Sequence, residues 1–96
     1  MKSEKELEEF FARLKKELTE TSLFPTQYLY KFIIPADESK LDQLKAVFKD
    51  TEAAISTRPS SNGKYTGDSV NLKVKNADEV IHFYKEAGKV EGILSL

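Results

Sequence analysis

Apolar residues recur every three or four positions in residues 3–18, which is the spacing of one helical face. The residues on that face are Leu7, Phe10, Phe11, Leu14 and Leu18. The other positions mix Lys and Arg with Glu, as expected of a solvated surface. The pattern predicts an amphipathic helix, and Pro25 predicts that a linker over residues 19–26 ends it before Phe24.

Two segments in which apolar and polar residues alternate predict two half-buried strands. Residues 27–34 alternate around aromatic and aliphatic side chains, and residues 65–75 direct Val70, Leu72 and Val74 to one side. A weaker strand over residues 53–59 ends at Pro59, which cannot donate to a neighbouring strand and therefore predicts a sheet edge. A short apolar segment, residues 90–96, predicts a last strand with Val90, Leu94 and Leu96 toward the core.

Two core helices separate these strands. The first carries apolar residues at helical spacing over residues 41–50, with Asp37 or Ser39 as its cap. The second follows Asn76 in a sequence similar to a capping box and ends at Gly88. Its predicted core stripe consists of Val80, Phe83, Tyr84 and Ala87.

Between the second and third strands, Asn62-Gly63 supplies the positive φ angles that a type I′ or related hairpin turn needs. The element order is β-α-β-β-α-β after an extra N-terminal amphipathic helix. Each β-α-β crossover must be right-handed, and both core helices must cover the apolar face of the sheet. These two conditions favour an α+β, ferredoxin-like sandwich with an antiparallel sheet in the order 4-1-3-2. We divide the chain into residues 1–22, the helix and linker, and residues 23–96, the ferredoxin-like domain.

The sheet face away from the core helices carries basic residues beside two apolar ones, Leu29 and Ile33. The polar and basic residues expected there are Lys31, Arg58, Asn71, Lys73 and Lys75. The N-terminal helix, a second subunit or a polyanion would each account for this surface. We favour the helix, because its apolar stripe needs a partner and its length of about 24 Å spans a four-stranded sheet.

Composition narrows the function classes. The chain has 96 residues with a net charge of -1 and no cysteine, so no global field attracts nucleic acid and no disulfide or thiolate site exists. The N-terminus is densely charged and no apolar run approaches a membrane span, so we expect a cytoplasmic protein without membrane contact.

Candidate chemistry is concentrated in residues 58–65. Arg58, Ser60, Ser61 and Lys64 surround the turn and are the candidates for contacting a ligand or partner, although turn formation alone accounts for Ser60 to Gly63. The single histidine, His82, has no second histidine or cysteine to complete a metal site, and helix capping explains the clustered carboxylates. We therefore expect no metal, no cofactor and no catalytic residue.

Two blocks of sequence resemble a known family. They are Phe24-Pro25-Thr26 leading into a strand with Lys31, and the run from Pro59 to Tyr65 ahead of an alternating strand. Together with the apolar C-terminal segment they resemble the YbeD family, small bacterial proteins of unknown function whose namesake has been called a lipoate regulatory protein. The resemblance implies a ferredoxin-like fold similar to the ACT regulatory domain, a non-enzymatic regulatory or ligand-sensing role, and oligomerisation.

Three functions compete. The first is a regulatory or protein-interaction module that forms homo-oligomers and binds a protein partner or a small effector. The second is an RNA-binding module like the RRM, using the basic sheet face of Lys31, Lys73 and Lys75, but the expected outward positions carry no aromatic residue for stacking on bases. The third, a hydrolase similar to acylphosphatase, lacks an arginine or glycine in the loop after the first strand. We favour the first.

Overall fold

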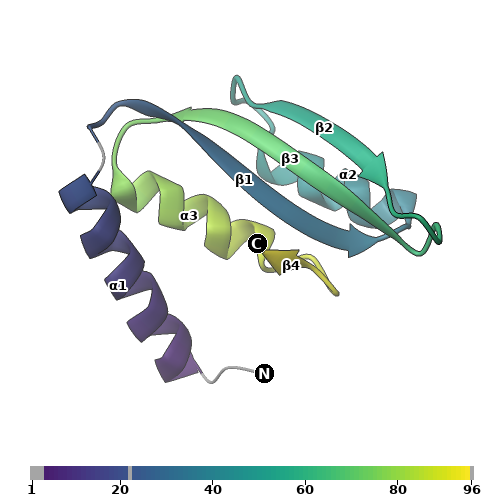
Figure 1. Ribbon diagram of the computed structural model, residues 1–96, viewed down its shortest axis with the longest axis horizontal. Helices are drawn as coiled ribbons and strands as arrows, with labels where there is room; N and C mark the ends of the chain where they lie inside the picture. Colours follow the sequence, from purple (N-terminus) through teal and green to yellow (C-terminus); the bar gives the residue numbers. More distant parts are fainter. Residues whose placement is uncertain (1–3, 22, 96) are drawn as a thin grey trace.

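The chain forms three helices and a four-stranded sheet in the order that the sequence predicts (Figure 1). The structure is a computed structural model that describes residues 4–21 and 23–95. Its elements are α1 (Glu4–Thr21), β1 (Thr26–Pro35), α2 (Glu38–Val47), β2 (Ala54–Pro59), β3 (Tyr65–Val74), α3 (Ala77–Ala87) and β4 (Leu94–Ser95). Within these described ranges, no helix is both long and apolar enough to cross a lipid bilayer.

The sheet is antiparallel with the order β2-β3-β1-β4, which confirms the predicted topology. Its centre is a ten-residue pairing that runs from Thr26 opposite Val74 to Pro35 opposite Tyr65. β2 lies at an edge and ends at Pro59, as the missing N–H of proline predicts.

The core lies between one face of the sheet and the helices α2 and α3. Alternate residues of β1 and β3 face this core, which confirms the period-two interpretation of both strands. The buried core residues are Tyr30, Phe32, Ile34, Leu44, Phe48, Val70, Leu72, Val74, Val80, Ala87 and Val90. No helix or strand of the described residues covers the other face of the sheet, and we call it the open face.

Side-chain caps position both core helices. The Asp37 carboxylate accepts a hydrogen bond from the Ser39 backbone N–H at 2.8 Å, and the Asn76 side chain accepts one from the Glu79 backbone N–H at 2.9 Å. Both caps agree with the sequence. The α3 cap, Asn76, lies two residues after the end of β3, so α3 starts at the sheet end where β1 also starts.

The β2–β3 hairpin differs from the predicted type I′ turn. That turn requires positive φ at two successive residues, whereas only Gly63, with φ of 72°, has it here. The Gly63 N–H donates to the Ser60 carbonyl at 3.1 Å, which closes a longer loop between the strands. The Asn62 side chain instead accepts the Ser60 hydroxyl at 2.8 Å and the Lys64 N–H at 3.0 Å.

The position of α1 corrects our expectation that this helix covers the open face. α1 ends at Thr21, before Phe24 as predicted although within the predicted linker, and it packs beside α3 on the helix side of the sheet (Figure 1). Residues 22–25 join it to the start of β1, next to the start of α3, where apolar side chains are available. The open face offers α1 mainly Lys and hydroxyl groups, so the stripe gains more by packing on α3.

The last strand is also shorter than expected. β4 contains only Leu94 and Ser95, paired with Ile33 and Phe32 of β1. Val90 is buried as predicted but precedes the strand, and Leu94 is 59% exposed rather than directed to the core. Ile93 packs on the core in its place, and the prediction for Leu96 lies outside the described residues.

Candidate functional site

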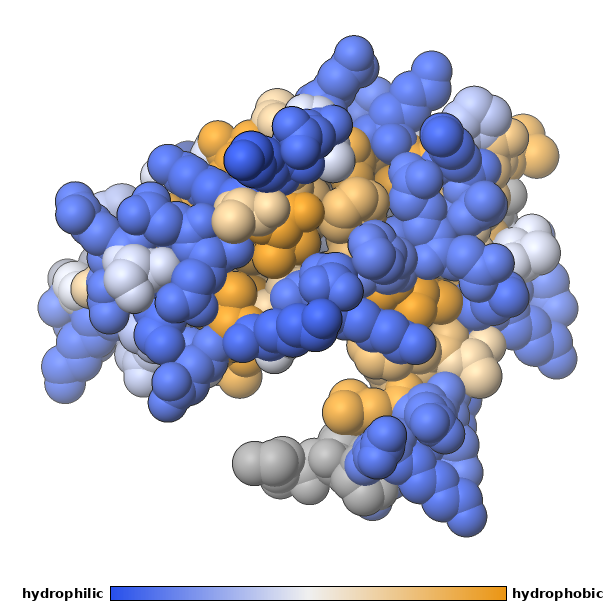
Figure 2. Space-filling view, turned by 180° about the vertical axis from the view of Figure 1, so that it is seen from behind, coloured by the Kyte–Doolittle hydropathy of each residue, from blue (hydrophilic) through white to orange (hydrophobic). Residues whose placement is uncertain are grey.

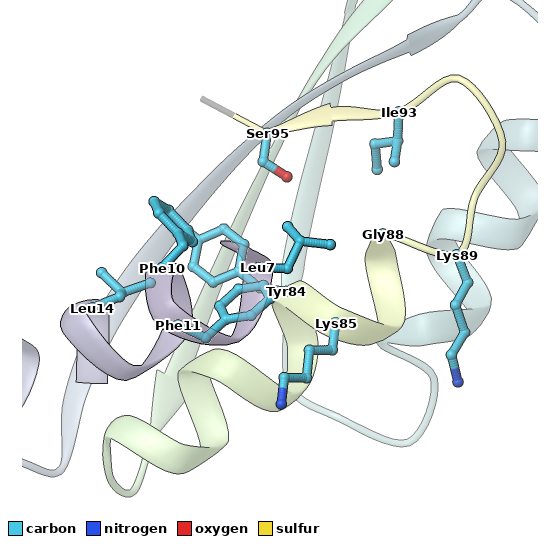
Figure 3. Close-up of a pocket in the computed structure, with 10 residues that line it drawn as sticks. All are labelled: Leu7, Phe10, Phe11, Leu14, Tyr84, Lys85, Gly88, Lys89, Ile93 and Ser95. Carbon is cyan, nitrogen blue, oxygen red and sulfur yellow. The ribbon is translucent and has the colours of Figure 1, made fainter. Parts of the chain in front are cut away.

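An apolar groove lies between α1 and the end of the domain formed by α3 and β4 (Figure 3). We call it the α1–α3 groove. Its volume is about 670 Å³. The lining residues are Leu7, Phe10, Phe11, Leu14, Tyr84, Lys85, Gly88, Lys89, Ile93 and Ser95.

The groove lies beside the N-terminal part of α1, whereas Phe11 near the middle of this helix and Lys15 further along it contact α3. Lys15 forms an ion pair with Asp78 at 2.8 Å, and the Lys85 ammonium lies 5.5 Å from the centre of the Phe11 ring. Toward its N-terminus α1 diverges from α3, as Figure 1 shows. Leu7 and Phe10 therefore remain 42% and 45% exposed.

The space-filling view makes the divergence visible. Figure 2 shows an open hollow between α1 and the body of the molecule, bordered by hydrophobic surface on the side of α1 that faces the body. Exposed apolar side chains gathered beside a hollow are a candidate interaction site. The groove can accept another apolar segment.

A rigid tyrosine cluster lies behind the groove wall. The Tyr84 and Tyr28 hydroxyls are hydrogen bonded at 2.8 Å, and the buried Tyr30 hydroxyl donates to the Val80 carbonyl at 2.9 Å. Burial raises the pKa of Tyr30, with a smaller contribution from Tyr84. Burial and the hydrogen bond with Tyr28 raise the pKa of Tyr84 as well. The phenols of Tyr30 and Tyr84 therefore stay protonated, and the hydrogen bonds of the cluster hold the groove wall in place.

The four candidate residues around the hairpin do not form one site. Ser60 is used by the loop itself, because its hydroxyl donates to Asn62 and accepts the Tyr65 N–H at 3.1 Å. Ser61 and Lys64 are exposed in the loop, and the Lys64 carbonyl accepts the Ala36 N–H at 2.9 Å. Arg58 lies earlier, near the end of the edge strand β2, opposite Gly67 of β3.

The three lysines predicted for the basic sheet face are all exposed. Lys31 and Lys73 lie on the open face, and Lys75 follows the end of β3. The register adds an aromatic residue that the sequence interpretation missed: Tyr65, 45% exposed, lies on the same face at the first position of β3. The paired outward positions on β1 carry no aromatic side chain, so the face lacks the two stacking platforms of an RRM.

Groups for metal binding are sparse in the described ranges. There, no cluster of three or more His, Cys, Asp or Glu side chains is arranged to hold a metal ion. His82 is exposed on α3 and contacts the Phe83 ring edge-on, with 5.2 Å between ring centres.

The α3 side of the groove was missed by sequence reasoning, although a signal for it exists. Ala77 and Ile81 are buried in addition to the predicted stripe, so α3 is apolar on two sides. A helix that is apolar on two sides packs against two layers. That pattern predicts a second partner for α3, which in the structure is α1.

With this geometry in view, comparison with known proteins assigns the family. Residues 19–95 match the family described as "Protein of unknown function (DUF493)". The chain belongs to the DUF493 family. The matched residues include β1 to β4, whereas most of α1 precedes them.

Relatives within this family carry the UPF0250 name. The UPF0250 protein YbeD of Escherichia coli is 28% identical over 81 residues, which cover 81% of this chain and 93% of YbeD. A UPF0250 protein of Yersinia pestis is 30% identical over the same shares. A UPF0250 protein of Neisseria meningitidis is 40% identical over 50 residues, so the chain spans only 55% of that relative's length. No solved structure matches the chain. The resemblance to the YbeD family is therefore confirmed, and the names of these relatives state no activity.

Proposed function

We propose that this DUF493 protein is a non-enzymatic regulatory module that assembles with a second copy of itself through the α1–α3 groove. The observation that carries the proposal is the exposure of Leu7 and Phe10, at 42% and 45%, in a groove lined by apolar side chains. Burying such surface against an apolar partner stabilises an assembly by roughly 25 cal/mol per Å² before the costs of association.

A second copy supplies an occupant of matching shape. α1 is itself an amphipathic helix, about 27 Å long at 1.5 Å per residue, and its exposed Leu7 and Phe10 belong to the same surface that needs covering. In a two-fold dimer each α1 stripe would pack in the groove of the other copy, because such an interface uses the same patch on both subunits.

Charge complementarity favours this occupant. The first half of α1 is acidic, with four glutamates and one lysine in residues 4–9. The groove rim carries Lys85 of α3 and Lys89, which follows α3 and is ion paired with Glu86 at 3.1 Å. An incoming α1 would bring its glutamates toward this basic rim, where opposite charges align two partners.

A non-enzymatic role fits the chemistry of the described residues. Burial keeps the Tyr30 and Tyr84 phenols protonated. The exposed His82 contacts the Phe83 ring. A regulatory role would follow if assembly depended on whether α1 is docked on its own α3 or on that of the second copy.

Sedimentation equilibrium of the full chain tests the proposal. We expect a concentration-dependent dimer whose dissociation constant rises at least tenfold in Leu7→Asp, because a carboxylate would be buried in an apolar interface. Leu23→Asp is the matched control: Leu23 is 92% exposed and lies outside the groove, so this variant should dimerise like the wild type.

Two results would contradict the proposal. A strictly monomeric wild type at several hundred micromolar would exclude self-assembly as the function of the groove. Equal weakening by Leu7→Asp and Leu23→Asp would mean that the interface lies elsewhere. Circular dichroism of both variants separates these outcomes from a loss of fold.

A further inference from the structure

The open face contains a shallow depression centred on Gly67, on the side of the sheet opposite to the α1–α3 groove. Its volume is about 470 Å³. The side chains that surround it on the open face come from three neighbouring strands: Lys31 and Ile33 of β1, Ser56 and Arg58 of β2, and Ser69 of β3. We call it the Gly67 depression.

The glycine at its floor has no structural cause. The Gly67 φ angle lies outside the left-handed region, and a Cβ at this position would meet only the Arg58 carbonyl oxygen, at the ordinary distance of 3.9 Å. Gly63 and Gly92 differ, since both have positive φ and a Cβ at Gly92 would lie 2.9 Å from the Pro35 ring. Glycine weakens a strand interior and often marks the close approach of a ligand.

The walls of the depression supply positive charge and hydroxyl donors. Arg58 lies opposite Gly67, while Ser56 and Lys31 lie on either side of Ser69. The two basic residues thus occupy diagonal corners about 12 Å apart at Cα, with the hydroxyls between them. Neither cation has an ion-pair partner in the described part of the chain.

Negative charge is absent from the same surface. The strand positions that face outward on the described sheet carry no Asp or Glu. The carboxylate nearest in sequence, Asp68, points to the opposite side, where it is buried and accepts the Thr66 hydroxyl at 3.3 Å. The open face is therefore locally basic on a chain whose net charge is -1.

We propose that the Gly67 depression binds the phosphate group of a small phosphorylated metabolite. Arginine presents a planar fork of donors to phosphate oxygens, lysine adds a second charge, and the serine hydroxyls can donate to the remaining oxygen. The glycine lets the phosphate approach the sheet backbone. Ile33 and the exposed Leu94 opposite it in β4 form an apolar border for the organic part of the ligand.

The proposal does not depend on assembly through the α1–α3 groove, because the two surfaces lie on opposite sides of the sheet. It also differs from RNA binding. A polymer would use the whole row of lysines and several stacking aromatics, whereas the described open face offers the single ring of Tyr65.

An NMR titration tests the site. Phenyl phosphate is added to the full chain at constant ionic strength, and the chemical shifts of the backbone amides are measured. We expect saturable shifts at Gly67, Ser69 and Ser56, and weaker shifts with inorganic phosphate, which lacks the apolar part. Arg58→Gln and Lys31→Gln should each weaken phenyl phosphate at least fivefold. Lys73→Gln, on the same face but outside the depression, should change its affinity less than twofold.

Gly67→Val provides a test that separates binding from folding. A Cβ at Gly67 would make only an ordinary contact and valine favours the strand conformation, so the urea midpoint should rise while phenyl phosphate binding is lost. Retained binding in folded Gly67→Val would overturn the proposal.

Three further outcomes would also overturn it. Shifts that do not saturate, or that chloride reproduces, would indicate non-specific screening. Equal weakening by Lys73→Gln and Arg58→Gln would indicate diffuse attraction by the whole face. An RNA oligonucleotide that binds more tightly than phenyl phosphate and depends equally on Lys73 would assign the face to a polymer.

Discussion

Tyr30→Phe tests how completely the tyrosine cluster is isolated from water. Tyr30 is 0% exposed, and its hydroxyl donates to the Val80 carbonyl at 2.9 Å. At pH 8 the loss of this one hydrogen bond should lower the free energy of unfolding by about 1 kcal/mol. The ring stays in place, so the aromatic packing around it is kept.

The effect should reverse at high pH. Burial raises the pKa of Tyr30 above its usual value of 10.0, so above pH 10 the unfolded chain releases the phenolic proton while the folded chain keeps it. The unfolded state then binds fewer protons, and the stability of the wild type falls by about 1.4 kcal/mol per pH unit from this residue. Tyr30→Phe has no phenol at this position, so its stability does not fall for this reason. The free energies of unfolding of the wild type and of Tyr30→Phe should therefore become equal at about pH 10.7.

Urea unfolding of both proteins at pH 8, 10 and 11 measures the crossing. Other groups titrate equally in the two proteins and cancel in the difference, provided that the m-value is unchanged. Tyr65→Phe is the matched control at pH 8, where removing a hydroxyl from a half-exposed ring should change stability by less than about 0.5 kcal/mol. If the difference between wild type and Tyr30→Phe stayed the same from pH 8 to pH 11, the phenol would not be protected by burial and the reasoning would fail.

Two further predictions concern stability. Asn76→Ala removes the acceptor for the Glu79 N–H at the start of α3 and should lower the free energy of unfolding by about 1 kcal/mol, whereas Asn76→Ser should largely preserve it; urea unfolding measures both. Gly92→Ala should cost about 1–3 kcal/mol, because its φ of 82° is strained for alanine and the new Cβ would meet Pro35. Gly67→Ala should instead raise the free energy of unfolding by about 0.5–1 kcal/mol. Thermal melts of both variants measure the two changes in stability, and changes of the same sign would refute the distinction between the two glycines.

Several features of the fold follow from short stretches of sequence. The alternation in β1 and β3 predicted which side chains are buried, and Pro59 predicted the edge strand. Asp37 and Asn76 predicted the helix starts, since a cap needs only its own side chain and backbone groups two or three residues away. Right-handed crossovers then left a single sheet order.

The sequence interpretation failed where a segment depends on residues distant in the chain. The apolar stripe of α1 predicted that α1 needs a partner but not which one, because α3 and the open face both offer surface. The lengths of β4 and of the hairpin loop also depend on neighbours across the sheet, not on local periodicity. A strand forms only as far as its partner pairs with it.

The sequence by itself therefore determined the order of the elements, their buried faces and their caps, all of which arise from interactions within a few residues. Only the tertiary structure decided that α1 diverges from α3 to leave a groove, and that Lys31, Arg58 and Gly67 lie beside one another on the face predicted for the two basic residues. These three residues lie on different strands, and it is the strand register, a property of the paired sheet, that brings them together.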